Sequence, residues 1–329
     1  MNQTFNFSRR QMLATTGVMA ASPISIRLAA QTVSDKPIKF ILPVGAGSGV
    51  DGITRAASNA LGKALGTSIV IDNQPGAGGV VGTNALTKSA PDGSTLSIVS
   101  NNHVIYPSVL KSLPFDPIKD ITPIAAIGST PMVLVVNAKF PAKNMQEFVA
   151  LLKANPGKYN YASSGNGTIL HLAAELMKDA TGTFATHIPY RGFGPMMADI
   201  IGGQVDFGVG ALPAVAGQIK SGNLRAICIA SSQRAPSHPD IPTAVEQGFP
   251  TYLVEGWFAA VGPAKMSAES VKRIHGAIVT AFASDEVKAA MARQGNTINI
   301  QSPEASTAFF QSELNKYAAV VKKAGIKPD

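Results

Sequence analysis

The chain has 329 residues, of which 45% are apolar and 15% are charged, and this balance indicates a globular protein and excludes a disordered one. Its formal net charge is +8, but no block of consecutive Lys or Arg follows the first thirty residues, which argues against a nucleic-acid-binding protein. A mild positive surplus suits a small anionic ligand instead, because it attracts anions over a distance.

The first thirty residues are predicted to be an export signal. Arg9 and Arg10 form a twin-arginine pair, an apolar run follows at 13–21, and Ala29 and Ala30 offer a cleavage site. The run is shorter than the roughly 20 residues that a membrane span requires. We therefore expect a periplasmic protein, exported by the twin-arginine route rather than the Sec route. The alternative is a frayed N-terminal helix of a cytoplasmic protein.

After the signal, short apolar runs alternate with segments of helical periodicity. The pattern predicts strands at 38–43, 68–72 and 96–100, with helices at 51–65 and 80–89 between them. This βαβαβ order is typical of a mostly parallel sheet with helices on both faces. The first part of the chain is therefore expected to form an α/β unit.

A second α/β unit is expected to follow the first. Its strands are predicted at 132–136, 159–162, 186–189, 205–209 and 226–230. Its helices are predicted at 145–153, 168–181 and 194–201. The C-terminal third then adds a strand near 257–261 and helices at 267–282 and 303–324.

Two such units, followed by leftover helices, predict a two-lobed α/β fold in which each lobe is a mostly parallel sheet flanked by helices. The most economical arrangement assigns 37–130 and 257–329 to the first lobe and 131–256 to the second. The chain would then cross near 131–137 and 255–262, where extended apolar segments could serve as hinge strands. Two lobes with a cleft between them are a common way to close around a small ligand.

The cysteines and histidines do not indicate a metal site. Cys228 is the only cysteine, and it lies in an apolar run, so it is interpreted as a small buried residue and not as a reactive thiol. The five histidines have neither H-x-H nor H-x-x-x-H spacing: His103, His171, His187, His238 and His275. No metal, cofactor or nucleotide is therefore expected.

A glycine-rich loop at 43–51 joins the first predicted strand to the first predicted helix. Its three glycines free the backbone to approach a ligand, and the helix N-terminus offers unpaired N–H groups and a positive dipole end. Asp51 is expected to cap this helix. The dinucleotide fingerprint does not fit, because a third glycine after Gly45 and Gly47 would have to stand at Val50. We interpret the loop as an anion cradle, and the alternative is a glycine-rich turn without a ligand.

Two later loops repeat the order of strand, glycine-rich loop and helix. One lies at 73–79, and the other, at 161–168, adds hydroxyl and amide side chains. These side chains could hydrogen-bond a carboxylate without a full opposing charge: Ser163, Ser164, Asn166 and Thr168. The alternative is a polar loop in which Thr168 only caps the next helix. His171 is interpreted as a structural partner of this loop rather than as a ligand contact.

Arg191 is the best candidate for a charged partner of the ligand, because a guanidinium matches a carboxylate with two hydrogen bonds. The alternative is a solvated surface arginine, and the neighbouring Tyr190 could pack against either the ligand or the core. Catalytic motifs are absent or weak, since no G-x-S-x-G elbow surrounds Ser48 and no carboxylate pair stands out. An enzyme is therefore a rival hypothesis without a motif to support it.

Together these motifs resemble the extracytoplasmic solute-binding proteins of tripartite tricarboxylate transporters, the TctC or Bug family. The resemblance covers the whole chain after the signal and is carried by segments in matching order: 43–51, 72–79, 90–96, 113–117, 161–171, 187–192, 202–207, 234–242 and 257–258. It implies a Venus-flytrap periplasmic binding protein, expected to be a monomer, that captures a small carboxylate and passes it to an integral membrane transporter.

The resemblance also implies which residues contact the ligand. One carboxylate would sit against the first glycine loop, held by backbone N–H groups and bridging waters. The contacts from the first lobe would be Val44, Gly45, Ala46, Gly47, Ser48 and Asn101. The contacts from the second lobe would be Ser163, Asn166, Thr168, Tyr190 and Arg191, with Gly210 beside them.

Two positions depart from the family pattern. Many relatives carry an acidic residue where Gly210 stands, and an aromatic residue is common where Val44 stands. An acidic residue could receive a ligand amino group, so Gly210 favours a roomier site for a ligand without one. Val44 is expected to widen the entrance. A dicarboxylate, and among these an aromatic one such as a phthalate isomer, is therefore expected rather than an amino acid. A rival hypothesis keeps the fold but lets the liganded protein report to a sensor kinase.

Overall fold

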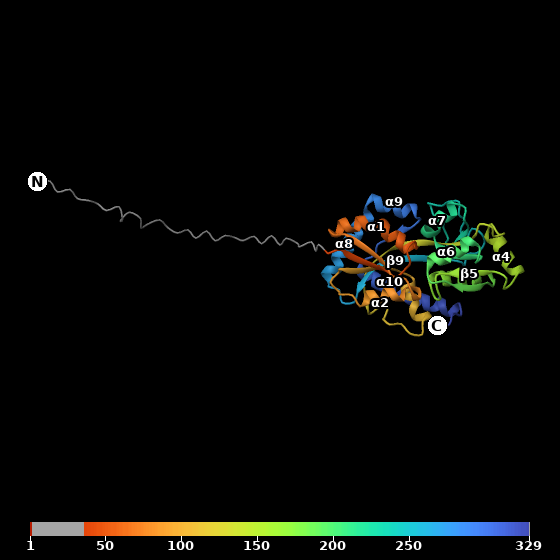
Figure 1. Cartoon of the computed structure of the whole chain (residues 1–329), viewed down its shortest axis with the longest axis horizontal. Helices are drawn as coiled ribbons and strands as arrows, with labels where there is room; N and C mark the ends of the chain where they lie inside the picture. The colour runs from red at the N-terminus through yellow and green to blue at the C-terminus, as the bar shows by residue number, and fades with distance from the viewer. Residues whose placement is uncertain (2–35, 329) are drawn as a thin grey trace. The chain divides into compact units, whose positions relative to one another are not determined.

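Three parallel strands form one side of the first sheet. In this computed structural model the described residues are Met1 and 36–328, so the expected export signal and its cleavage site lie outside them (Figure 1). Strand β1 (Ile38–Leu42) pairs in parallel with β2 (Ile69–Asn73) on one side and with β3 (Thr95–Ser100) on the other. All residues of β1 except Lys39 are buried, as befits a strand covered on both faces.

Helices connect these strands in the predicted order. α1 (Gly49–Leu65) buries one apolar face and ends at Gly66, which adopts the left-handed conformation. Its N-cap is Ser48, whose hydroxyl accepts the Asp51 N–H, so the expectation that Asp51 caps the helix is wrong. The other elements of this region are a 3-10 turn and two helices: η1 (Ala77–Gly79), α2 (Val80–Thr87) and α3 (Asn102–Val109).

Two long strands carry the chain between the two halves of the fold. β9 (Glu255–Pro263) lies antiparallel between β3 and β4 (Ile121–Asn137). Residues 121–131 of β4 pair with β9, whereas residues 132–137 pair with the strands of a second sheet. β4 is longer than the strand predicted at 132–136, because register shifts near Pro123 and Gly128 accommodate residues that interrupt a strand pattern.

The second sheet is built around the end of β4. Two antiparallel neighbours flank that end, β7 (Phe207–Ala211) and β8 (Leu224–Ile229). β5 (Asn160–Ser163) then pairs in parallel with both β7 and β6 (Thr186–Pro189). The helices of this region are α4 (Met145–Ala154), α5 (Ile169–Thr181), α6 (Phe193–Gly202) and α7 (Leu212–Lys220). The strands of each α/β unit are thus parallel, and the crossing strands are antiparallel.

The C-terminal region returns to the first sheet. Its elements are α8 (Ala268–Ala283), α9 (Asp285–Arg293), β10 (Thr297–Ile298) and α10 (Pro303–Lys323). α8 packs against α1, and β10 pairs with the first half of β4. α10 reaches both halves, because the Ser306 hydroxyl accepts the Ala126 N–H at 2.8 Å while Lys323 pairs with Asp179 of α5 at 2.9 Å.

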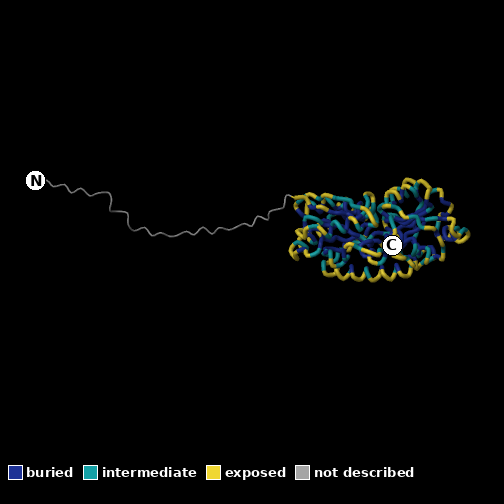
Figure 2. Tube along the Cα trace, turned by 60° about the horizontal axis from the view of Figure 1, so that its bottom comes forward, coloured by how far each residue is buried: buried dark blue, intermediate teal, exposed yellow. Residues whose placement is uncertain are grey.

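Two sheets that share β4 give the two-lobed α/β fold that the sequence predicts. We call the elements around β1, β2, β3 and β9 the first lobe and those around β5 to β8 the second lobe. The residue boundaries given for the lobes in the sequence analysis remain a prediction. Figure 1 shows α1 and α8 over one sheet and α4, α6 and α7 over the other. Figure 2 shows the buried interior of both. Cys228 is buried, as expected. No helix of the described part is long and apolar enough to cross a bilayer.

Candidate functional site

A cavity of about 480 Å³ lies at the carboxyl ends of the strands, where loops of both lobes meet. Parallel strands end at one edge of a sheet, and ligands of α/β proteins bind outside that edge. Small-molecule sites occupy roughly 300–1,000 Å³, so this cavity has a suitable size. Its described lining residues are 43–45, 48–50, Ile53, 75–79, 100–102, Leu110, Thr130, Met132, 164–166, Ile169, Leu170, 189–193, Ala211 and 256–258.

Six helices begin at this cavity. The first residues of α1, α3, α5 and α6 line it, as do the N-cap of α7 and the turn η1 that leads into α2. The unpaired N–H groups and positive dipole ends of helices attract anions. Among the described lining residues none is acidic, and Arg191 alone carries a positive charge. The described lining of the cavity is therefore more favourable for an anion than for a cation.

The first glycine loop is held from behind by a buried carboxylate. Asp51 is only 3% exposed and accepts the Gly47 N–H at 2.9 Å, the Arg55 Nε–H at 3.0 Å and the Asn73 amide at 3.0 Å. Burial raises the pKa of Asp51, but the hydrogen bonds from Arg55, Gly47 and Asn73 outweigh it and bring the pKa below its ordinary value. The ionised Asp51 fixes the shape of the loop. The Gly47 N–H is bonded to Asp51 and so does not point to the cavity as a free donor.

The loop at the end of β5 is held by hydroxyl groups. The Thr168 hydroxyl donates to the Gly165 carbonyl at 2.8 Å and accepts the His171 N–H at 3.4 Å, so Thr168 is the N-cap of α5. The Ser163 hydroxyl lies 2.6 Å from His187 Nε2 and accepts the Gly165 N–H at 3.2 Å. Ser163 is fully buried and Thr168 is 2% exposed, so both support the loop from inside the second lobe.

Two stacked imidazoles lie under this loop. The rings of His171 and His187 are 3.9 Å apart, and His187 also stacks on Tyr161 at 4.8 Å. His171 Nδ1 accepts the Gly167 N–H at 3.0 Å, so His171 is a structural partner of the loop, as interpreted from the sequence. Burial, with smaller contributions from His171 and Lys178, lowers the pKa of His187 to about 3. The loop therefore rests on a neutral His187.

Seven of the twelve predicted contact residues line the cavity: Val44, Gly45, Ser48, Asn101, Asn166, Tyr190 and Arg191. The other five do not: Ala46, Gly47, Ser163, Thr168 and Gly210. The Gly47 N–H and the hydroxyls of Ser163 and Thr168 are committed to the protein itself, as described above. Every loop with predicted contacts except that of Gly210 thus places at least one of them at the cavity, and their contact with a ligand stays a prediction.

The expectation that Gly210 widens the site is wrong. A Cβ atom at Gly210 would lie 2.5 Å from Val215 Cγ1, so the glycine allows α7 to pack closely against β7. Val44, the other departure from the family pattern, does line the cavity. Any extra room for a ligand therefore comes from Val44 and not from Gly210.

Three of the predicted contacts differ in how free their polar atoms are. Asn101 is fully buried and binds the Tyr317 hydroxyl at 2.7 Å and the Trp257 N–H at 2.9 Å, so its amide holds the wall in place. The Tyr190 hydroxyl donates to Asp199 at 2.7 Å, and burial together with Asp199 raises the pKa of Tyr190 to about 12. Arg191 is exposed and lies in no ion pair with a carboxylate of the described residues.

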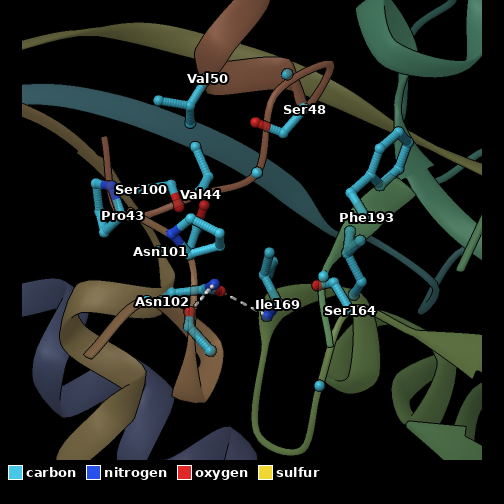
Figure 3. Close-up of a pocket in the computed structure, with 18 of the residues that line it drawn as sticks. Pro43, Val44, Ser48, Val50, Ser100, Asn101, Asn102, Ser164, Ile169 and Phe193 are labelled. Carbon is cyan, nitrogen blue, oxygen red and sulfur yellow. Dashed lines mark hydrogen bonds between the residues drawn. The ribbon is translucent and has the colours of Figure 1, made fainter. Parts of the chain in front are cut away.

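Several lining residues were not predicted as contacts. Asn102 and Phe193 project into the region between the lobes (Figure 3), and Trp257 contributes from β9. Asn102 is the first residue of α3, a helix that the apolar periodicity did not predict because Pro107 interrupts the pattern. Phe193 follows Arg191 by two residues, and residues 75–79 belong to the glycine-rich loop noted at 73–79, so proximity to these features was the available signal. No group of three or more His, Cys, Asp or Glu in the described part is placed to hold a metal ion.

Two lobes that share crossing strands, with an anion-attracting cavity at the ends of both sheets, define a solute-binding protein of the periplasmic type. Residues 53–326 match the family described as the tripartite tricarboxylate transporter family receptor, TctC. The chain belongs to this family, as its sequence motifs indicated.

Relatives cover almost the whole chain. The protein BugT of Bordetella pertussis is 35% identical over 320 residues, which are 96% of this chain and 98% of BugT. The structure of Rpa4515 from R. palustris with adipate is 27% identical, has a TM-score of 0.86, and is matched over 89% of this chain and 98% of its own. MatC from Rhodopseudomonas palustris with bound malate is 27% identical, has a TM-score of 0.81, and is matched over 87% and 98%.

Proposed function

We propose that this periplasmic solute-binding protein captures a small dicarboxylate in the cavity between its lobes and delivers it to a tripartite tricarboxylate-type membrane transporter. The observation that carries the proposal is the convergence of six helix N-termini and Arg191 on a cavity whose described lining contains no acidic residue. Such an arrangement stabilises negative charge through hydrogen bonds and dipoles. Relatives of similar fold are described with adipate and with malate, which both carry two carboxylates.

The helix N-termini form two groups, which supports a ligand with two anionic ends. α1 meets α7 where Gly49 faces Ala211, and Phe193 of α6 lies beside the same strand end. On the other side, Asn102 of α3 contacts both η1 and the start of α5. Each group can receive one carboxylate, so a dicarboxylate spans the cavity from one group to the other.

The walls between the two groups favour an apolar ligand body. Their side chains include Val44, Leu110, Met132, Phe193 and Trp257. A ring or a methylene chain packs against such walls, whereas a hydroxyl group would lose hydrogen bonds to water. An ammonium group would meet no carboxylate there. An aromatic dicarboxylate such as a phthalate isomer, or an aliphatic one such as adipate, is therefore preferred over an acidic amino acid.

Isothermal titration calorimetry tests the ligand class. The panel contains phthalate isomers, adipate, malate, citrate, benzoate, aspartate and glutamate, and we expect the tightest binding for dicarboxylates with an apolar body. Arg191→Gln should weaken that binding by about 10- to 100-fold, because it removes charge-assisted hydrogen bonds. The matched control is Arg293→Gln on the exposed surface of α9, which should leave the affinity unchanged. Tight binding of aspartate or glutamate alone would contradict the proposal.

Transport, export and oligomeric state complete the proposal. Deletion of the gene should abolish cellular uptake of the identified dicarboxylate without changing transcription, which separates a transport receptor from a ligand-presenting sensor. Export by the twin-arginine route is proposed from Arg9 and Arg10, and replacing both by Lys should retain the precursor in the cytoplasm. A monomer is expected, and light scattering of the purified protein measures its mass.

A further inference from the structure

The Asn102 side chain connects the two lobes beside the cavity. Asn102, the first residue of α3, donates from Nδ2 to the Gly78 carbonyl of η1 at 3.0 Å. Its Oδ1 accepts the N–H of Ile169, the first residue of α5, at 2.8 Å (Figure 3). The first bond stays within the first lobe, whereas the second crosses to the second lobe.

The backbone around this amide permits a very close approach of the lobes. A Cβ atom at Gly167 would lie 2.3 Å from Val109 Cγ2, and one at Gly78 would lie 3.5 Å from Thr168 Cγ2. Both glycines have positive φ, which also favours residues without a side chain. The loop before α5 is thus seated directly on α3 and η1, and Asn102 lies in this contact with 9% exposure.

The bond to Ile169 has a specific physical role. The first N–H groups of a helix have no partner within the helix. Thr168 serves as the cap within the second lobe, but its hydroxyl accepts the N–H of His171 and not that of Ile169. The first donor of α5 is therefore satisfied by the other lobe, and separating the lobes removes this partner.

The opposite flank of the cavity is different. There α1 and α7 meet through Gly49 and Ala211, where a Cβ atom at Gly49 would lie 2.9 Å from the Ala211 Cβ. This is an apolar contact between small residues. Polar contacts between the lobes therefore lie on the flank of α3 and α5, where the Asn102 amide acts beside the cavity and Lys323 of α10 pairs with Asp179 of α5.

We propose that Asn102 is a latch between the lobes, a positioning residue that favours the closed cleft and so slows ligand release. The consequence for release rests on the proposed function, whereas the effect on the lobes does not require a ligand. Loss of one neutral hydrogen bond shifts an equilibrium by about 2- to 10-fold. Asn102→Ala should therefore raise the open fraction and the ligand dissociation rate by this factor, with little change in the association rate.

Pulsed electron paramagnetic resonance on the ligand-free chain tests the latch. Spin labels are placed at the exposed positions Lys88→Cys in the first lobe and Lys153→Cys in the second, while the buried Cys228 stays unlabelled. Asn102→Ala should move the distance distribution to longer values. Asn137→Ala is the matched control, because the Asn137 amide also donates from Nδ2, at 2.9 and 2.8 Å, and accepts at Oδ1, from the Lys139 N–H at 2.9 Å, but all these bonds stay within the second lobe.

A second variant separates a latch from local support of the first lobe. Asn102→Asp keeps an acceptor for the Ile169 N–H, where a negative charge also suits the helix N-terminus, but it loses the donor to Gly78. The latch predicts that Asn102→Asp retains the short distances and that Asn102→Ala does not. Equal distributions for both variants and the unmodified chain would overturn the proposal, as would long distances for both variants.

Stopped-flow release of adipate, used as the probe, adds the kinetic test. A 2- to 10-fold faster dissociation of Asn102→Ala with an unchanged association rate supports the latch. A weaker affinity with an unchanged distance distribution would show that Asn102 contacts the ligand directly, and would overturn it. If adipate and every other carboxylate fail to bind, the proposed function fails, and the distance distributions still decide the role of Asn102.

Discussion

The loops after β1 and after β5 present similar backbones to the cavity but rest on different chemistry. Positive φ occurs at Gly47 in the first loop and at Gly165 and Gly167 in the second. Each loop ends at a hydroxyl N-cap, Ser48 or Thr168. The first loop is fixed by the ionised Asp51, whose charge is offset by Arg55, and the second by hydroxyls and stacked imidazoles. Both lobes can thus present backbone N–H groups to the cavity. The conformation of the loop depends on a charged residue in the first lobe and on neutral side chains in the second.

The largest expected effect is the loss of the charge under the first loop. Asp51→Ala removes the acceptor of Gly47, Arg55 and Asn73, so we expect the free energy of unfolding to fall by about 3 kcal/mol. Urea denaturation monitored by circular dichroism measures it. The control Asp240→Ala replaces an exposed aspartate and should change stability by less than about 0.5 kcal/mol. Similar values for both variants would show that the loop does not depend on this carboxylate.

The second loop should be sensitive to acid. The pKa of His187 is about 3 in the folded protein, below its ordinary value of 6.5, so the unfolded chain binds more protons between these pH values. Stability due to a neutral His187 is therefore present above pH 6.5 and is lost as the pH falls towards 3. The groups around His187 are His171, Tyr161, Ser163 and Lys178.

His187→Leu isolates this contribution. At pH 7 the variant should be about 2 kcal/mol less stable, because Ser163 loses its partner. The difference from the unmodified chain should shrink as the pH falls to 4.5, since Leu binds no proton. The buried His103, whose pKa is lowered to about 4 by burial, destabilises both proteins equally in acid. Parallel pH profiles of melting temperature for the two proteins would contradict the prediction.

The smallest effects concern the two N-caps. Thr168→Ala should lower the free energy of unfolding by about 1.5 kcal/mol, and Ser48→Ala by about 0.7 kcal/mol. The order is expected because Thr168 is buried and also bonds Gly165, whereas Ser48 is half-buried. Thr280→Ala, at an exposed position of α8, is the control and should have almost no effect. A larger loss for Ser48→Ala would reverse the comparison.

The order of strands and helices could be predicted from the sequence where apolar periodicity is clean. β1 to β3, α1, α5 and α8 all fall close to their predicted positions. The first half of β4 and helix α3 could not, because Pro123, Gly128 and Pro107 interrupt the patterns. Pairing with β9 and packing against α10 stabilise these segments, and such tertiary contacts leave no local signal.

Prediction of the candidate site from sequence is limited in a similar way, at the level of single residues. Successive side chains of a strand point to opposite faces, so a one-residue error exchanges inside and outside. Ser163 therefore faces His187, while the adjacent Ser164 lines the cavity. Likewise Gly210 packs against Val215, and Ala211 lines the cavity. Sequence identifies polar loops, but the register of the strand decides which residue lines the cavity.

The position of β9 has a consequence for the order in which the chain can fold. The strands of the second sheet all lie between residues 132 and 229, so that sheet is complete in a short stretch of chain. In the first sheet, β3 and β4 are both joined through β9, which ends only at Pro263. Pairing over such long sequence separations is slow. During synthesis the second lobe can therefore finish first, and the first lobe cannot close before residue 263 has been made.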